Sequence, residues 1–133
     1  MQFNFRGAFG HEILNFQRMF YENPYNPAYN MLETAYDPVY GQQLNSDLAL
    51  VSHYIEKGDY LKLDNFTVGY TFPKVSFLRN ARVYASGLNL FTITGYKGID
   101  PEGVDVTGFY PGNDERDKYP TTRTYTLGLN LTF

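Results

Sequence analysis

Large apolar and small polar side chains alternate along residues 123–133. One parity carries an arginine followed by large apolar residues: Arg123, Tyr125, Leu127, Leu129, Leu131 and Phe133. The other parity is small and uncharged: Thr124, Thr126, Gly128, Asn130 and Thr132. Because successive side chains of a strand point to opposite faces, this pattern predicts a β-strand with one apolar face and one polar face.

This segment has two interpretations. A tilted strand crosses the hydrocarbon core of a bilayer with about 9 to 11 residues, and an apolar outer face that ends in an aromatic residue is typical of a transmembrane β-barrel. An ordinary half-buried antiparallel strand alternates as well, so the segment by itself leaves both interpretations open.

The same period predicts further strands at about residues 2–9, 60–72 and 82–94. The last of these is the least regular, because Leu88 and Leu90 interrupt its alternation. Together with residues 123–133, the four strands make residues 1–133 an all-β, antiparallel unit.

Two details of these strands carry expectations of their own. In residues 60–72 the apolar side chains change parity near Asp64, which indicates a β-bulge or the point where the strand leaves the membrane. We expect Pro73 to end this strand. Residues 11–20 lose the alternation and fit either a short helix or a bent strand.

The predicted connections alternate in length. Residues 21–54 and 95–122 are long and rich in Pro, Gly, Asn and Tyr, whereas residues 73–80 make a short connection. Loops this long are uncommon in compact domains unless they serve binding or gating. Outer-membrane barrels alternate short periplasmic turns with long extracellular loops in the same way. Tyrosines recur along the first long loop, where they either stack on a ligand or pack the loop to itself: Tyr25, Tyr29, Tyr36 and Tyr40.

Composition narrows the function classes. The 13 Tyr and 11 Phe make 18% of residues aromatic while the mean hydropathy is -0.41, which suits alternating strands with aromatic girdles and also a glycan-binding β domain. A net charge of -3 without a basic run gives no support for a nucleic-acid partner. Cysteine is absent, which excludes disulfides and thiolate metal sites.

Catalytic and metal chemistry has little support in the sequence. His11 and His53 are isolated, so we predict no zinc site, no catalytic triad and no cofactor. The acidic side chains of the second long loop match no compact calcium motif and are expected to be solvated: Asp100, Glu102, Asp105, Asp114, Glu115 and Asp117. An enzyme is the least supported class.

Four motifs, in this order, resemble those of one transporter family. Residues 58–73 resemble G-x-Y-L-R-L-x-N-x-T-L-G-Y-T-F-P, and residues 82–92 resemble R-V-Y-x-S-G-x-N-L-F-T. Residues 96–102 resemble Y-x-G-x-D-P-E, and residues 119–125 resemble Y-P-x-x-R-T-Y. The family is that of the SusC-type, RagA-like TonB-dependent outer-membrane transporters of Bacteroidetes.

The resemblance implies that the chain is a C-terminal fragment of a large plugged transmembrane β-barrel. The earlier strands, the plug domain, the TonB box and the signal peptide are expected to be missing from it, and four strands cannot close a membrane barrel, since the smallest have about 8. The whole protein would lie in the outer membrane of a Gram-negative bacterium, in contact with its lipid. It would import glycans or peptides, powered by the TonB complex through the missing N-terminal parts and covered by a SusD-like surface lipoprotein.

The same resemblance suggests candidate site residues. Phe133 would be the signal that the barrel-assembly machinery recognises, and the two long loops would face the lipoprotein or the substrate. For sugar recognition we expect Tyr96, Tyr110 and Tyr119 to offer aromatic faces, with an interfacial aromatic belt as their competing role. Asp100 and Arg123 would instead fix the loop ends.

An alternative function comes from a different class, a soluble all-β carbohydrate-binding or adhesin module. It requires the apolar faces of the predicted strands to be buried against one another as one core. A soluble module should fold without detergent, whereas a barrel fragment should not, because it exposes apolar faces and unpaired strand edges.

Overall fold

The computed structural model describes residues 1–25, 30–37, 51–75, 78–103, 112–114 and 118–133. The chain divides into two compact units. The sheet unit comprises Met1–Ala8, Tyr60–Ile93 and Thr121–Phe133, and the loop unit comprises Phe9–Asp59 and Thr94–Pro120. Among the described residues, no helix is long and apolar enough to cross a membrane.

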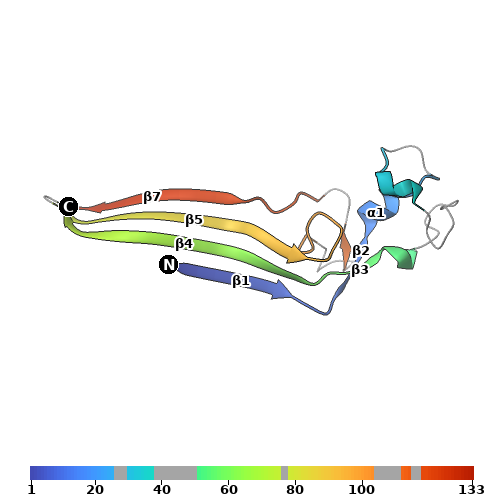
Figure 1. Ribbon diagram of the computed structural model, residues 1–133, viewed down its shortest axis with the longest axis horizontal. Helices are drawn as coiled ribbons and strands as arrows, with labels where there is room; N and C mark the ends of the chain where they lie inside the picture. Colours follow the sequence, from blue (N-terminus) through green and yellow to red (C-terminus); the bar gives the residue numbers. More distant parts are fainter. Residues whose placement is uncertain (26–29, 38–50, 76–77, 104–111, 115–117) are drawn as a thin grey trace. The chain divides into compact units, whose positions relative to one another are not determined.

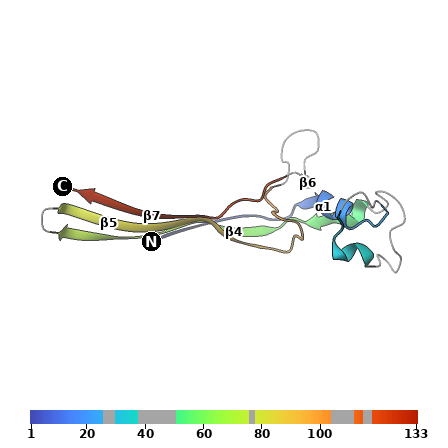
Figure 2. The same cartoon turned by 90° about the horizontal axis from the view of Figure 1, so that it is seen from above.

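The sheet unit holds a four-stranded sheet in the order β1-β4-β5-β7. Its strands are β1 (Gln2–Ala8), β4 (Tyr60–Val75), β5 (Leu78–Thr94) and β7 (Thr124–Thr132). The strands β4, β5 and β7 run side by side (Figure 1, Figure 2). The fold is therefore all-β in this unit, as the alternation predicts.

The strand β4 continues past Pro73, so the expectation that this proline ends the strand is wrong. The reason lies in the pairing of β4 with β1, which reaches no further than Thr67. Beyond Thr67 that edge of β4 has no paired neighbour in the described structure, and proline is tolerated at a strand edge because no ladder bond needs its missing N–H. Only residues 76–77 separate β4 from β5, and they lie outside the described residues.

A β-bulge at Asp64 confirms the predicted irregularity of β4. The pairing steps from Asn4↔Asn65 to Phe5↔Leu63, so Asp64 is the extra residue. The bulge places Leu63 and Phe66 on one face although they are three positions apart, because their partners Phe5 and Phe3 share a parity. The rings of Phe3 and Phe66 meet there with centroids 5.1 Å apart.

The register between β5 and β7 keeps one face apolar and the other polar. Val83 pairs with Leu129 and Ala85 with Leu127, whereas Tyr84 pairs with Gly128 and Arg82 with Asn130. Directly paired residues share a face, so the period-two pattern of β7 continues across β5.

The irregular end of β5 also has a local cause. Asn89 has a φ of 52°, a left-handed backbone conformation that asparagine adopts more readily than most non-glycine residues. It follows Leu88, the last residue of β5 paired with β7. The side chain of Asn89 donates to the carbonyl oxygen of Thr122 at 3.2 Å.

The loop unit contains short elements. They are β2 (Glu12–Asn15), α1 (Phe16–Tyr21), two 3₁₀ helices η1 (Glu33–Tyr36) and η2 (Val51–Tyr54), β3 (Ile55–Lys57) and β6 (Asn113–Asp114). A three-stranded sheet runs in the order β3-β2-β6, in which β2 is antiparallel to β3 and parallel to β6. Figure 2 labels α1 and β6 of this unit.

The ambiguous segment 11–20 is both strand and helix. Asn15 ends β2 and caps α1, because its side-chain oxygen accepts the Arg18 N–H at 3.0 Å. Ile13 and Met19 are buried on either side of this change, together with Tyr54 from η2. The loop unit therefore has a small core of its own.

Candidate functional site

Tyr96 is held inside the loop unit. Its side chain is only 6% exposed, and its hydroxyl donates to Asp114 Oδ2 at 2.5 Å. Burial raises the pKa of the Tyr96 hydroxyl above its ordinary value, and the hydrogen bond to Asp114 raises that pKa further. The contact joins the start of the second long loop to β6.

Gly98 packs against the Tyr96 ring. A Cβ built on Gly98 would lie 2.3 Å from Tyr96 Cε1, so only glycine fits there without moving the ring. One part of the ring is therefore covered by backbone. The burial of Tyr96 leaves little aromatic surface for a sugar, and its observed contacts are those of a loop anchor.

Asp100 closes a turn in the same loop. Its Oδ1 accepts the Glu102 N–H at 3.1 Å, and its backbone oxygen accepts the Gly103 N–H at 3.1 Å. An aspartate that bonds the backbone two residues on is an Asx turn, which suits the intervening Pro101. Asp100 thus shapes its own end of the loop, the structural alternative that the sequence left open.

Tyr119 is the exposed aromatic candidate. It is 83% exposed and borders a small hollow of the loop unit. The polar side chains that line this hollow come from α1, from the Asp100 turn, from β6 and from the segment before Tyr119: Gln17, Asp100, Asp114 and Lys118. The stacking role of Tyr119 stays a prediction, and Tyr110 lies outside the described residues.

Two of the four tyrosines that the sequence singles out in the first long loop are described, and both are exposed. Tyr25 is 58% exposed and Tyr36 is 59% exposed, whereas Tyr29 and Tyr40 lie outside the described residues. Among the residues that the structure describes, no group of three or more His, Asp or Glu side chains is placed to hold a metal ion.

A buried ionic group, which we name the Arg18 cluster, consists of Arg18, Glu22, Tyr54 and Glu56. Arg18 Nε donates to Glu22 Oε1 at 2.8 Å, and Arg18 Nη2 lies 2.7 Å from Glu22 Oε2. Arg18 Nη1 also donates to Glu56 Oε1, and the guanidinium carbon lies 5.7 Å from the centre of the Tyr54 ring. One side chain thus makes a two-pronged pair, a second ion pair and a cation–π contact.

Burial and charge compete at Arg18. Burial alone lowers the pKa of its guanidinium, but the hydrogen bonds to Glu22 and Glu56 outweigh this effect, so the pKa lies above its ordinary value. Arg18 therefore stays charged. Sequence reasoning missed the cluster, although the spacing of Arg18 and Glu22, four residues apart on a helix, is a signal that could have found half of it.

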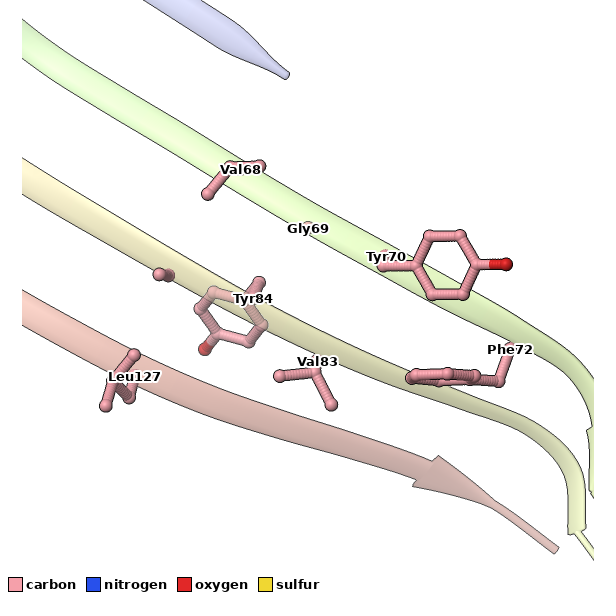
Figure 3. Close-up of a pocket in the computed structure, with 8 residues that line it drawn as sticks. Val68, Gly69, Tyr70, Phe72, Val83, Tyr84 and Leu127 are labelled. Atoms are coloured by element: carbon pink, nitrogen blue, oxygen red, sulfur yellow. The ribbon is translucent and has the colours of Figure 1, made fainter.

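The sheet unit presents a shallow apolar hollow between β4, β5 and β7. Figure 3 shows Val68, Tyr70 and Phe72 of β4 with Val83 of β5 and Leu127 of β7. The rings of Tyr70 and Phe72 meet edge to face, with centroids 4.7 Å apart. Leu127 is 85% exposed and Leu129 is 60% exposed, so this face is not covered by the described part of the chain.

On the opposite, polar face of the sheet, Tyr84 occupies the space that two glycines leave free. A Cβ on Gly128 would lie 2.1 Å from Tyr84 Cζ, and a Cβ on Gly69 would lie 3.1 Å from Tyr84 Cβ. Tyr84 thus packs across the polar face between β4 and β7. Phe133 follows the end of β7 and is 75% exposed.

No family model matches the chain, but comparison with individual known proteins finds relatives of one kind. A TonB-dependent receptor of Formosa agariphila is 31% identical over 98% of this chain and 15% of the receptor. The TonB-dependent receptor SusC of Bacteroides thetaiotaomicron is 35% identical over 61% of this chain and 8% of that receptor. The solved RagAB peptide transporter superposes with a TM-score of 0.76 at 26% identity, over 98% of this chain and 15% of that chain.

The sheet, with one apolar and one polar face, and these relatives together define the chain as part of a TonB-dependent receptor. Within that class it belongs to the SusC/RagA type, as the four sequence motifs predict. The chain spans 8–15% of the length of the relatives that it matches.

Proposed function

We propose that residues 1–133 supply barrel wall and extracellular loops to an outer-membrane importer of the SusC type, which takes up a glycan or an oligopeptide. The observation that carries this proposal is the exposed apolar face of a four-stranded sheet whose other face is polar. The likeness to the RagAB peptide transporter supports it over nearly the whole chain.

The apolar face of the sheet contacts outer-membrane lipid. In a transmembrane barrel the outward side chains meet hydrocarbon and the inward ones meet a polar interior. Tyr125, Leu127 and Leu129 are all at least 60% exposed, and transfer from water into an apolar medium stabilises each large apolar side chain by roughly 1.5–3 kcal/mol. The soluble-module alternative is not favoured, because it requires these faces to be buried against one another.

The remaining partners follow from the same proposal. The inner-membrane TonB complex delivers energy through N-terminal parts of the whole protein, and a SusD-like surface lipoprotein covers the loops. Tyr119 offers an exposed ring, which suits stacking on the apolar face of a sugar or on a peptide group. Phe133 serves the assembly machinery.

The first test asks whether the chain folds without a membrane. We expect residues 1–133, expressed without detergent, to aggregate, and to regain β-structure in detergent or after co-expression with the upstream strands of a relative. Size exclusion and thermal circular dichroism measure both results. A monodisperse monomer that melts cooperatively in water would contradict the barrel proposal and favour the soluble module.

The second test addresses uptake. We would place residues 1–133 into the matching part of the Bacteroides thetaiotaomicron SusC and compare Tyr119→Ala with Tyr125→Ala, an exposed tyrosine on the apolar face of β7. We expect Tyr119→Ala to raise the substrate concentration that gives half-maximal uptake, and Tyr125→Ala to leave it unchanged. Equal effects of the two variants would remove Tyr119 from the site.

A further inference from the structure

Two segments that are distant in the sequence share the Arg18 cluster. Arg18 and Glu22 belong to α1 and the residue after it, and Tyr54 and Glu56 belong to η2 and β3. The pairing of Arg18 with Glu56 joins residues 38 positions apart. The two ends of the first long loop, residues 21–54, are therefore tied together through one guanidinium.

Each carboxylate of the cluster also reaches a further segment. Glu22 Oε1 accepts the Thr34 hydroxyl at 2.8 Å, so the cluster holds η1. Glu56 Oε2 accepts the Lys97 N–H at 2.9 Å, so it also holds the start of the second long loop. A continuous path thus runs from Thr34 through Glu22, Arg18 and Glu56 to Lys97.

The cluster is sheltered from solvent. The side chains of Arg18 and Glu56 are 14% and 12% exposed, and that of Glu22 is 9% exposed. Removing one partner of a buried pair leaves a charge without compensation, which costs far more than breaking an exposed pair. The exposed pair Arg6–Asp64, with side chains 49% and 40% exposed, offers a matched comparison in the same chain.

We infer that Arg18 is a positioning residue that couples residues 30–37 of the first long loop to residues 96–103 of the second, so that order imposed on one segment is transmitted to the other. The inference rests on the proposed import function, in which these loops face the substrate and the lipoprotein. A ligand that orders the residue 97 segment then also orders η1, and the reverse holds because coupling between sites is reciprocal.

The geometry requires arginine and not merely a positive charge. Two nitrogens of the planar Arg18 guanidinium bind Glu22, and the third binds Glu56. The guanidinium also lies over the Tyr54 ring. A lysine ammonium is a compact point charge that cannot keep all three contacts. Arg18→Lys should therefore keep the charge and lose the coupling.

The test is hydrogen–deuterium exchange on the SusC chimera that carries residues 1–133, purified in detergent. We expect Arg18→Met to speed amide exchange roughly 100-fold in both residues 30–37 and residues 96–103, and Arg18→Lys to speed it in both by about tenfold. Arg6→Met should change neither segment. Exchange that rises only around α1, or in neither segment, would overturn the inference.

Two further variants separate the branches of the path. Thr34→Val removes the contact to Glu22 and should loosen residues 30–37 more than residues 96–103. Glu56→Gln weakens the contacts to Arg18 and to the Lys97 N–H and should loosen residues 96–103 more than residues 30–37. If either variant loosens one segment and leaves the other unchanged, or loosens both equally, the path through Arg18 is wrong.

Uptake separates positioning from a general loss of folding. We expect Arg18→Lys to raise the half-saturating substrate concentration while the maximal uptake rate is kept, because loops that move separately bind less well but the barrel still conducts. A fall in the maximal rate together with a loss of folded barrel in gel mobility would mean a structural role only. A chimera that shows the exchange pattern but transports nothing would refute the proposed function and leave the loop coupling standing.

Discussion

An arginine placed on either face of β7 tests the face assignment directly. Leu127 and Thr126 are neighbours near the middle of the strand, and they pair with Ala85 and Ser86 on opposite faces of the sheet. An arginine on the lipid face near the bilayer midplane costs about 2–4 kcal/mol, whereas inward positions of a barrel are polar and tolerate it. Leu127→Arg should therefore lower the folding equilibrium constant roughly 30- to 700-fold, since each 1.4 kcal/mol is about a factor of ten.

The assay is the folded fraction of the SusC chimera in lipid vesicles across a urea series, read from gel mobility with and without heating. Leu127→Arg should shift the midpoint to lower urea, and Thr126→Arg should leave it within about 0.5 kcal/mol of the parent. Leu127→Ala separates the lost leucine from the added charge. If the two arginine variants shift the midpoint equally, or if Thr126→Arg is the worse, the apolar face of β7 does not meet lipid.

Four further predictions concern single contacts. Tyr96→Phe leaves the buried Asp114 carboxylate without its hydrogen bond and should destabilise residues 96–103 by about 1–3 kcal/mol, measured by amide exchange, while Tyr125→Phe on the exposed strand should not. The pKa of Tyr96 is raised in the folded protein, so its contribution to stability is complete below the unfolded pKa of about 10 and is lost as the pH rises further. Residues 96–103 should therefore loosen at alkaline pH in the parent but not in Tyr96→Phe. Gly98→Ala forces the Tyr96 ring aside and should cost about 1–3 kcal/mol in the same assay, with Gly95→Ala, where a Cβ meets nothing, as the control. Gly128→Ala should destabilise the barrel, and most of this loss should vanish in a Tyr84→Ala background; equal costs in both backgrounds would show that Tyr84 does not fill that space.

The sheet could be predicted from the sequence because each strand is specified by residues that are neighbours in the chain. The alternation around Leu127 depends only on neighbours in the sequence, and the parity change at Asp64 is visible without a structure, since a bulge must follow if both apolar sets are to share a face. Pro73 shows the limit. Whether a proline ends a strand depends on whether a neighbouring strand needs its N–H, and the end of β1 opposite Thr67 cannot be read from residues around Pro73.

The loop contacts were harder to predict because their partners are distant in sequence. Arg18 and Glu22 are one helical turn apart and are detectable, but Glu56 is 38 residues away and Asp114 is 18 residues from Tyr96. No periodicity connects such pairs. An exposed aromatic and a buried one also look the same in the sequence, which is why Tyr96 and Tyr119 received the same expected role although their exposures are 6% and 83%.

The contrast between these two tyrosines also separates motif residues that shape a loop from residues that remain exposed to a ligand. In the stretch 96–102, Tyr96 packs on Gly98 and bonds Asp114, while Asp100 closes its own turn. These three motif residues therefore shape the loop through contacts inside the loop unit. A substrate can meet only groups that are exposed and not held by such contacts, and Tyr119 is an exposed ring of this kind. In the proposed importer, substrate choice should therefore change with substitutions around Tyr119 while the contacts of Tyr96, Gly98 and Asp100 stay the same.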